Sequence, residues 1–86
     1  MDDIAIWRKR IDEIDEKLVS LLNERAACAI EIGRIKCAKG LDIYNPVREK
    51  SIMDNIVKLN NGPLDKAAIQ RLFGLIIEEC REIENR

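Results

Sequence analysis

The chain has 86 residues, of which 47% are hydrophobic and 36% are charged, and its 15 basic and 16 acidic side chains leave a net charge of −1. This length allows one domain, residues 1–86, and the near-zero net charge excludes an overall electrostatic footprint for nucleic acid or an anionic membrane. Histidine is absent, so any chemistry must do without the commonest metal ligand and the commonest general base near neutral pH.

The first predicted helix begins after an N-cap at Asp2 or Asp3 and ends at Gly40, which offers a left-handed stop. One face of it carries residues at three-four spacing, namely Ile4, Trp7, Ile11, Ile14, Leu18, Leu21, Arg25, Cys28, Ile32 and Ile35. Because a guanidinium keeps its charge, burying Arg25 is costly unless an anion meets it. Lys36 lies within about 20° of the same face and roughly 16 Å further along the axis. The sequence therefore predicts two cations that face an anion inside the bundle.

The first helix is too long for a compact domain of this size. Its rod of roughly 54 Å contrasts with an expected radius of gyration near 12 Å. A second copy of the chain is therefore predicted to cover the remaining stripe, in an intertwined two-fold homodimer. The alternative is a monomer whose long helix breaks near residues 26–29, where neither proline nor glycine occurs.

Arg8 lies about 25 Å from Arg25 along the helix axis, so the two cannot hold one small molecule from the same helix. In an antiparallel dimer, Arg8 of one chain could lie beside Arg25 and Lys36 of the other. The alternative is that Arg8 belongs to a solvated basic turn.

Two further helices follow, and no strand pattern occurs. The second begins at Asn45, an N-cap followed by proline in the first helical position, and is broken at Asn60–Pro63. The third begins near Asp65 and continues to the end of the chain. Their inward sides carry Glu49, Ile52, Met53, Ile56 and Leu59 in the second helix and Ile69, Leu72, Phe73, Ile76, Ile77, Cys80 and Glu84 in the third. The predicted fold class is all-α, with three helices per chain and a very long first helix.

Targeting signals, membrane segments and cysteine spacing are the sequence features that predict the cellular compartment. No stretch of eighteen apolar residues and no signal-peptide pattern occurs, since the first ten residues are strongly charged. Cys28, Cys37 and Cys80 are widely spaced and form no C-x-x-C pair, which argues against a disulfide framework or a zinc site. We expect a cytoplasmic protein with reduced thiols, no metal and no membrane segment.

Five segments, spread over nearly the whole chain, form a pattern that is specific only in combination. They are residues 7–15 (WRKRIDEID), 21–25 (LLNER), 32–36 (IGRIK), 45–49 (NPVRE) and 72–78 (LFGLIIE). Together they resemble the all-helical class of chorismate mutase. The resemblance implies an intertwined homodimer with two active sites, each completed by an N-terminal arginine of the other chain. It also implies the Claisen rearrangement of chorismate to prephenate, a cofactor-free step of the shikimate pathway to phenylalanine and tyrosine, in a domain that occurs alone or fused to prephenate-processing enzymes.

The resemblance also implies a role for individual residues. Arg25 and the partner's Arg8 would bind the two substrate carboxylates. Lys36 would contact a carboxylate and the ether oxygen, where negative charge develops in the transition state. Arg48 would support the carboxylate end of the site, and Glu49 would accept a hydrogen bond from the ring hydroxyl. Without the resemblance, Arg48 and Glu49 would be interpreted as surface charges in the first turn of a helix.

Three positions depart from the commoner family pattern. Asn45 stands where an aspartate often precedes Pro-x-Arg-Glu, so it can cap the helix but cannot bring the same charge to the substrate. Cys80 stands where a small hydroxyl residue is common, which weakens a hydrogen bond there. Glu84 stands where some members have a glutamine that donates to the ether oxygen. An ionised carboxylate cannot donate, so activity is predicted to decline as the pH rises through the titration of Glu84, unless Glu84 merely frays into solvent.

Two other functions stay open from the sequence. A non-catalytic helical dimerisation or regulatory module would show the same heptad seam, although it would gain little from two buried cations. An isochorismate pyruvate lyase on the same scaffold would need the same carboxylate-binding groups. The combination of Arg25, Lys36, Arg48, Glu49 and Glu84 favours the mutase, and nucleic-acid binding is disfavoured because a basic face and aromatic platforms are lacking.

Overall fold

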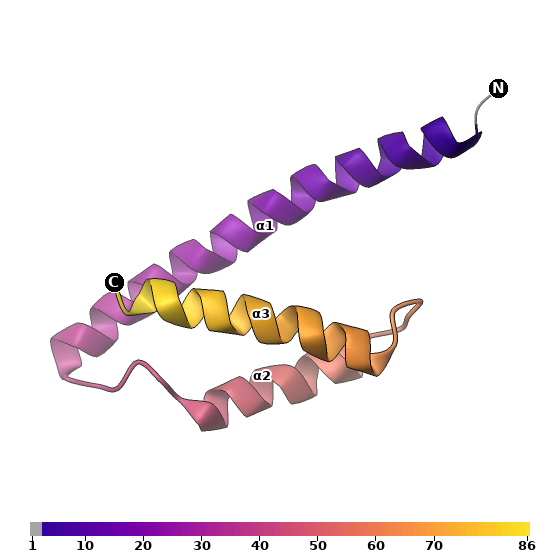
Figure 1. Cartoon of the computed structure of the whole chain (residues 1–86). Helices are drawn as coiled ribbons and strands as arrows, with labels where there is room; N and C mark the ends of the chain where they lie inside the picture. The colour runs from indigo at the N-terminus through magenta and orange to yellow at the C-terminus, as the bar shows by residue number, and fades with distance from the viewer. Residues whose placement is uncertain (1–2) are drawn as a thin grey trace.

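The computed structural model describes residues 3–86, which form three α-helices and no strand (Figure 1). α1 spans Asp3–Lys39, α2 spans Pro46–Leu59 and α3 spans Lys66–Glu84. The prediction of an all-α chain with three helices and a very long first helix is confirmed. Within the described residues, no helix is both long enough and apolar enough to cross a membrane.

α1 is one continuous helix of 37 residues, and residues 26–29 lie within it. The break that a compact monomer would need is therefore not present. The chain measures 60 × 23 × 15 Å and has a radius of gyration of 16.3 Å, well above the value of about 12 Å for a compact domain of this length. Figure 1 shows the N-terminal half of α1 projecting away from the other two helices, with its N-terminal turns beyond their ends.

The C-terminal end of α1 follows the predicted glycine signal. Gly40 has a φ of +67°, and the backbone N–H of Leu41 donates to the carbonyl oxygen of Lys36 at 2.8 Å, so a left-handed residue closes the helix. At the other end, the proposed N-cap at Asp3 is wrong, because the backbone of this residue is already helical. The alternative N-cap, Asp2, lies outside the described residues.

Side-chain caps begin the two shorter helices, at Asn45 as predicted and at Asp65, near which the third helix was predicted to begin. Asn45 Oδ1 accepts a hydrogen bond from the backbone N–H of Arg48 at 3.0 Å, and Asp65 Oδ1 accepts one from Ala68 at 2.8 Å. Each cap satisfies an N–H group that has no partner within its helix. α3 remains helical to Glu84, two residues before the end of the chain, so the frayed alternative for this residue is not observed.

α3 packs against both α1 and α2, whereas α1 and α2 make no close backbone contacts with each other within residues 3–86. Ala29 and Ile77 are the buried apolar side chains of the described chain. Side chains of the α1 stripe are 45–64% exposed at Ile4, Trp7, Ile11, Ile14, Leu18, Leu21, Ile32 and Ile35. A single chain therefore leaves this apolar stripe exposed. The stripe is the surface that a second chain was predicted to cover.

Gly33 is buried where α1 meets the end of α3. A Cβ at this position would lie 2.5 Å from the carbonyl oxygen of Glu84 and 3.1 Å from its Cα. Such distances are shorter than van der Waals contact, and the atoms met belong to the backbone, which cannot rotate away. The absence of a side chain at Gly33 thus lets α3 place Glu84 directly over α1.

We expect Gly33→Ala to push the end of α3 away from α1 and to lower the free energy of unfolding by about 1–3 kcal/mol, as overpacking does elsewhere. Urea unfolding at one fixed protein concentration measures the loss. Gly74→Ala is the control, since an added Cβ there meets nothing within 4 Å in its own chain and is expected to be neutral or slightly stabilising. Equal stability of the Gly33 variant and the unchanged chain would contradict the close approach.

Candidate active site

A cavity of about 370 Å³ lies between α1, α2, α3 and the loop that joins α1 to α2. Seven of the eight site residues proposed from the sequence line it, namely Arg25, Lys36, Asn45, Arg48, Glu49, Cys80 and Glu84. Apolar side chains, Ala29, Ile32, Ile52 and Ile77 among them, form much of the remaining wall. The volume lies in the range of small-molecule sites, and polar groups set in an apolar wall are typical of such sites.

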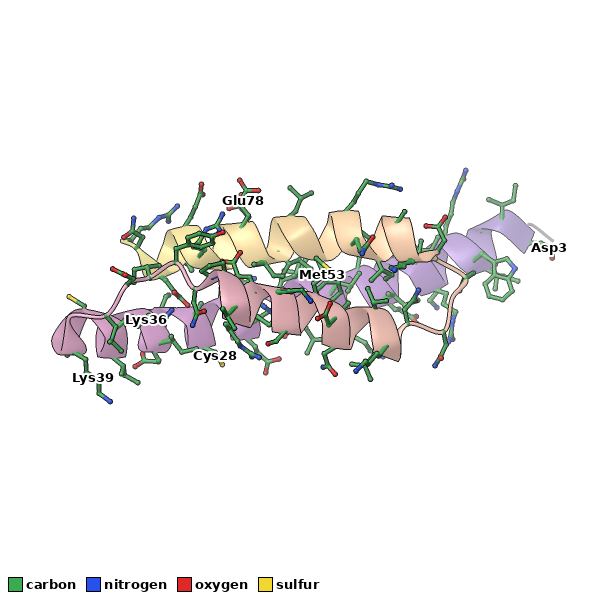
Figure 2. The ribbon with its side chains drawn as sticks, turned by 90° about the horizontal axis from the view of Figure 1, so that it is seen from below. Asp3, Cys28, Lys36, Lys39, Met53 and Glu78 are labelled. Atoms are coloured by element: carbon green, nitrogen blue, oxygen red, sulfur yellow. The ribbon has the colours of Figure 1, made fainter. Side chains whose placement is uncertain are left out.

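Lys36 links three of the segments that form the cavity. Its Nζ donates to the carbonyl oxygen of Ile43 in the loop at 2.8 Å and to Glu84 Oε2 in α3 at 3.3 Å. The Lys36 and Glu84 side chains are only 19% and 13% exposed, so their charges are poorly screened by water. Figure 2 shows Lys36 directed from α1 toward the rest of the bundle, whereas Lys39 points away from it.

A second ion pair joins α3 to the first turn of α2. Arg81 Nη1 lies 2.9 Å from both carboxylate oxygens of Glu49, and the guanidinium carbon lies 4.8 Å from the centroid of the Tyr44 ring. Sequence reasoning missed Arg81. A signal was available, because Arg81 lies four residues after Ile77 and three before Glu84 and therefore shares their helix face.

Arg25 and Arg48 are the cations of the cavity that have no carboxylate partner within residues 3–86. The guanidinium of Arg48 donates one long hydrogen bond, 3.5 Å from Nη1 to the hydroxyl of Ser51. The charges of the cavity thus divide into two ion pairs and two cations that remain available. This excess of positive charge, set in a partly apolar wall, suits a small ligand that carries two negative charges.

The remaining proposed residues differ in position. Asn45 and Cys80 line the cavity, and Asn45 also caps α2 as predicted. Arg8 does not line the cavity of its own chain, because it lies in the projecting half of α1 and is exposed there. Within the described residues, no three His, Cys, Asp or Glu side chains lie close enough together to hold a metal ion.

The chain is similar in sequence to known proteins over almost its whole length. A family model described as chorismate mutase type II matches residues 7–85. The bifunctional chorismate mutase/prephenate dehydratase of Pseudomonas aeruginosa is 39% identical over 88 residues, which cover 96% of this chain and 24% of that protein. The chain thus spans about a quarter of the length of the bifunctional relatives. The chorismate mutase of Methanocaldococcus jannaschii is 34% identical over 87 residues, which cover all of this chain and 88% of that protein.

Solved structures show the same arrangement of helices. Form II of the chorismate mutase of Thermus thermophilus superposes with a TM-score of 0.97 at 32% identity and covers 99% of this chain and 97% of its own. The chorismate mutase of Helicobacter pylori, solved in complex with prephenate, has a TM-score of 0.86 at 24% identity, with 95% and 89% of the two chains covered. At that lower identity the likeness concerns the fold alone.

Proposed function

The chain belongs to the type II chorismate mutase family, and from this premise we propose that it converts chorismate to prephenate on the route to phenylalanine and tyrosine. The observation that carries the proposal is the division of charge in the cavity. Two ion pairs leave Arg25 and Arg48 without a carboxylate partner, and the substrate brings two carboxylates. A site for a neutral ligand would have no use for this excess of positive charge.

The reaction requires the protein to restrain the substrate conformation and to stabilise the charge of the transition state. One C–O bond breaks as one C–C bond forms within the same molecule, so neither a nucleophile nor an obligatory proton transfer is required. Holding the enolpyruvyl arm over the ring lowers the barrier by fixing the reactive conformer. Guanidinium groups bind carboxylates with paired hydrogen bonds, and the ammonium of Lys36 brings a compact positive charge to the ether oxygen as negative charge develops there.

We also propose that the active form is an intertwined homodimer in which the partner's Arg8 completes each cavity. The exposed stripe of α1 and the elongated shape of the single chain support this proposal. The position of Arg8 supports it as well, since this side chain lies outside its own cavity. A two-fold axis that places α1 helices antiparallel would bury the stripe and bring each Arg8 to the other chain.

The function is tested by incubating the purified chain with chorismate and, separately, with isochorismate. We expect loss of chorismate absorbance and formation of prephenate, identified by chromatography of the products. Release of pyruvate from isochorismate without prephenate formation would instead assign a lyase. Calorimetric titration with chorismate tests the third function, a non-catalytic dimerisation or regulatory module. A chain that neither binds nor converts chorismate would be assigned to that class.

We further expect Glu84→Gln to keep or raise kcat for chorismate. The Glu84 carboxylate accepts a hydrogen bond from Lys36 at 3.3 Å and cannot itself donate to the ether oxygen, whereas a glutamine amide can donate there and carries no negative charge. The measurement is kcat of both proteins under the same conditions. A kcat of the Gln variant well below that of the unchanged chain would contradict this role of the side chain at position 84.

A further inference from the structure

We propose that Arg81 is a positioning residue, which holds the Glu49 carboxylate in the orientation that accepts the ring hydroxyl of the substrate; this inference rests on the proposed function. Arg81 reaches Glu49 from a different helix. Its Nη1 lies 2.9 Å from each carboxylate oxygen, so one terminal nitrogen faces both oxygens and restricts where the carboxylate can point.

The Glu49 side chain needs a contact outside its own helix to fix its orientation, because α2 packs against only one other helix of the described chain. α2 makes no close backbone contact with α1 and packs only on α3 within the described chain. A glutamate side chain has several rotatable bonds, and ordering it costs entropy each time a ligand binds. The ion pair with Arg81 orders the carboxylate before the substrate arrives, although Glu49 is still 25% exposed.

The guanidinium is itself held in place. Its carbon lies 4.8 Å from the centroid of the Tyr44 ring, so the flat cation lies over the aromatic face and is stabilised by it. Arg81 therefore joins the loop, α2 and α3 on one side of the cavity, much as Lys36 joins α1, the loop and α3 on the other. An ammonium would keep the charge at this position but would lose the planar stacking.

The ion pair leaves Glu49 able to act on the substrate. An ionised carboxylate has about four acceptor positions, and the two hydrogen bonds from Arg81 occupy two of them. The remaining two can accept a hydroxyl proton from the cavity, which Glu49 lines. Because this contact forms with both the bound substrate and the transition state, its loss should appear mainly in KM.

The test is a double-mutant cycle of Arg81→Met and Glu49→Met, with chorismate as substrate. Arg81→Met alone is expected to lower kcat/KM about tenfold, the effect of one misplaced hydrogen bond to a charged group, mostly through KM. In the Glu49→Met background the same change should have less than about a twofold effect, since the acceptor that Arg81 positions is absent there. Arg81→Lys should recover part of the loss.

A substrate analogue without the ring hydroxyl separates positioning from folding. Arg81→Met should turn over this analogue as the unchanged chain does, whereas a general loss of structure would lower both activities. Arg71→Met, at an exposed position of α3, is the matched control and should retain full activity. Independent losses in the cycle, or equal losses with both substrates, would overturn the role of Arg81. An unchanged chain that neither binds nor converts chorismate would reject the proposed function, and with it this role.

Discussion

Lys36→Ala is expected to lower kcat for chorismate at least 10²–10³-fold, about the effect of removing one preorganised group that stabilises developing charge. Lys36 lies in a poorly hydrated part of the cavity, where its side chain is 19% exposed and its charge acts strongly. Loss of the ammonium would also leave Glu84 without its ion-pair partner and the carbonyl oxygen of Ile43 without its donor. The cavity would then hold a carboxylate where positive charge is needed.

Two further variants show whether the loss of kcat comes from the missing charge of Lys36. Lys36→Gln retains a hydrogen-bond donor, one bond shorter than lysine, but no charge, so it should fold like the unchanged chain and still lose most of the activity. Lys39→Ala removes an exposed lysine that points away from the bundle (Figure 2), and it should have no effect on kcat. Steady-state kinetics and circular dichroism at matched concentration provide the readout. A Gln variant with more than about a third of the original kcat would mean that the charge of Lys36 does not drive the reaction.

The helix ends were predictable because each depends on a few neighbouring residues. Asn45, Asp65 and Gly40 act at the predicted positions, since caps and left-handed stops are local chemistry. The first residue of α1 was harder to predict, also because capping depends on neighbouring residues. Two adjacent aspartates offer the same capping group, and the nearby sequence does not distinguish them.

Most residues that line the cavity were predictable, but the ion pairs between them were not. Helical periodicity places Arg25 and Lys36 on one face of α1, and the family resemblance added Arg48 and Glu49, which local patterns alone would leave on the surface. Helical periodicity could have placed Arg81 on the inward face of α3, but its pairing with Glu49, 32 positions away in another helix, is encoded in no local pattern. The need for Gly33 was equally hidden, since it comes from the backbone of α3.

The strongest test of the proposed dimer is complementation between two inactive variants. Arg8→Ala should lower kcat/KM about 100-fold, the loss expected for a charge-assisted pair of hydrogen bonds to a carboxylate, and Lys36→Ala should be nearly inactive. After co-refolding from urea in equal amounts, half of the dimers contain one chain of each kind. In such a dimer one cavity carries both changes and the other carries neither. The mixture should therefore recover about one quarter of the original activity.

A second mixture makes the interpretation specific. Lys36→Ala combined with Arg25→Ala should stay inactive, because both residues line the cavity of their own chain and every cavity in the mixed dimer lacks one of them. Recovery in the first mixture and not in the second can arise only if Arg8 acts in the cavity of the other chain. If neither mixture recovers activity, although subunit exchange is shown by mass spectrometry, Arg8 does not complete the partner's site. Full activity of Arg8→Ala by itself would make Arg8 part of a solvated basic turn, and the exposed α1 stripe would then need a different explanation.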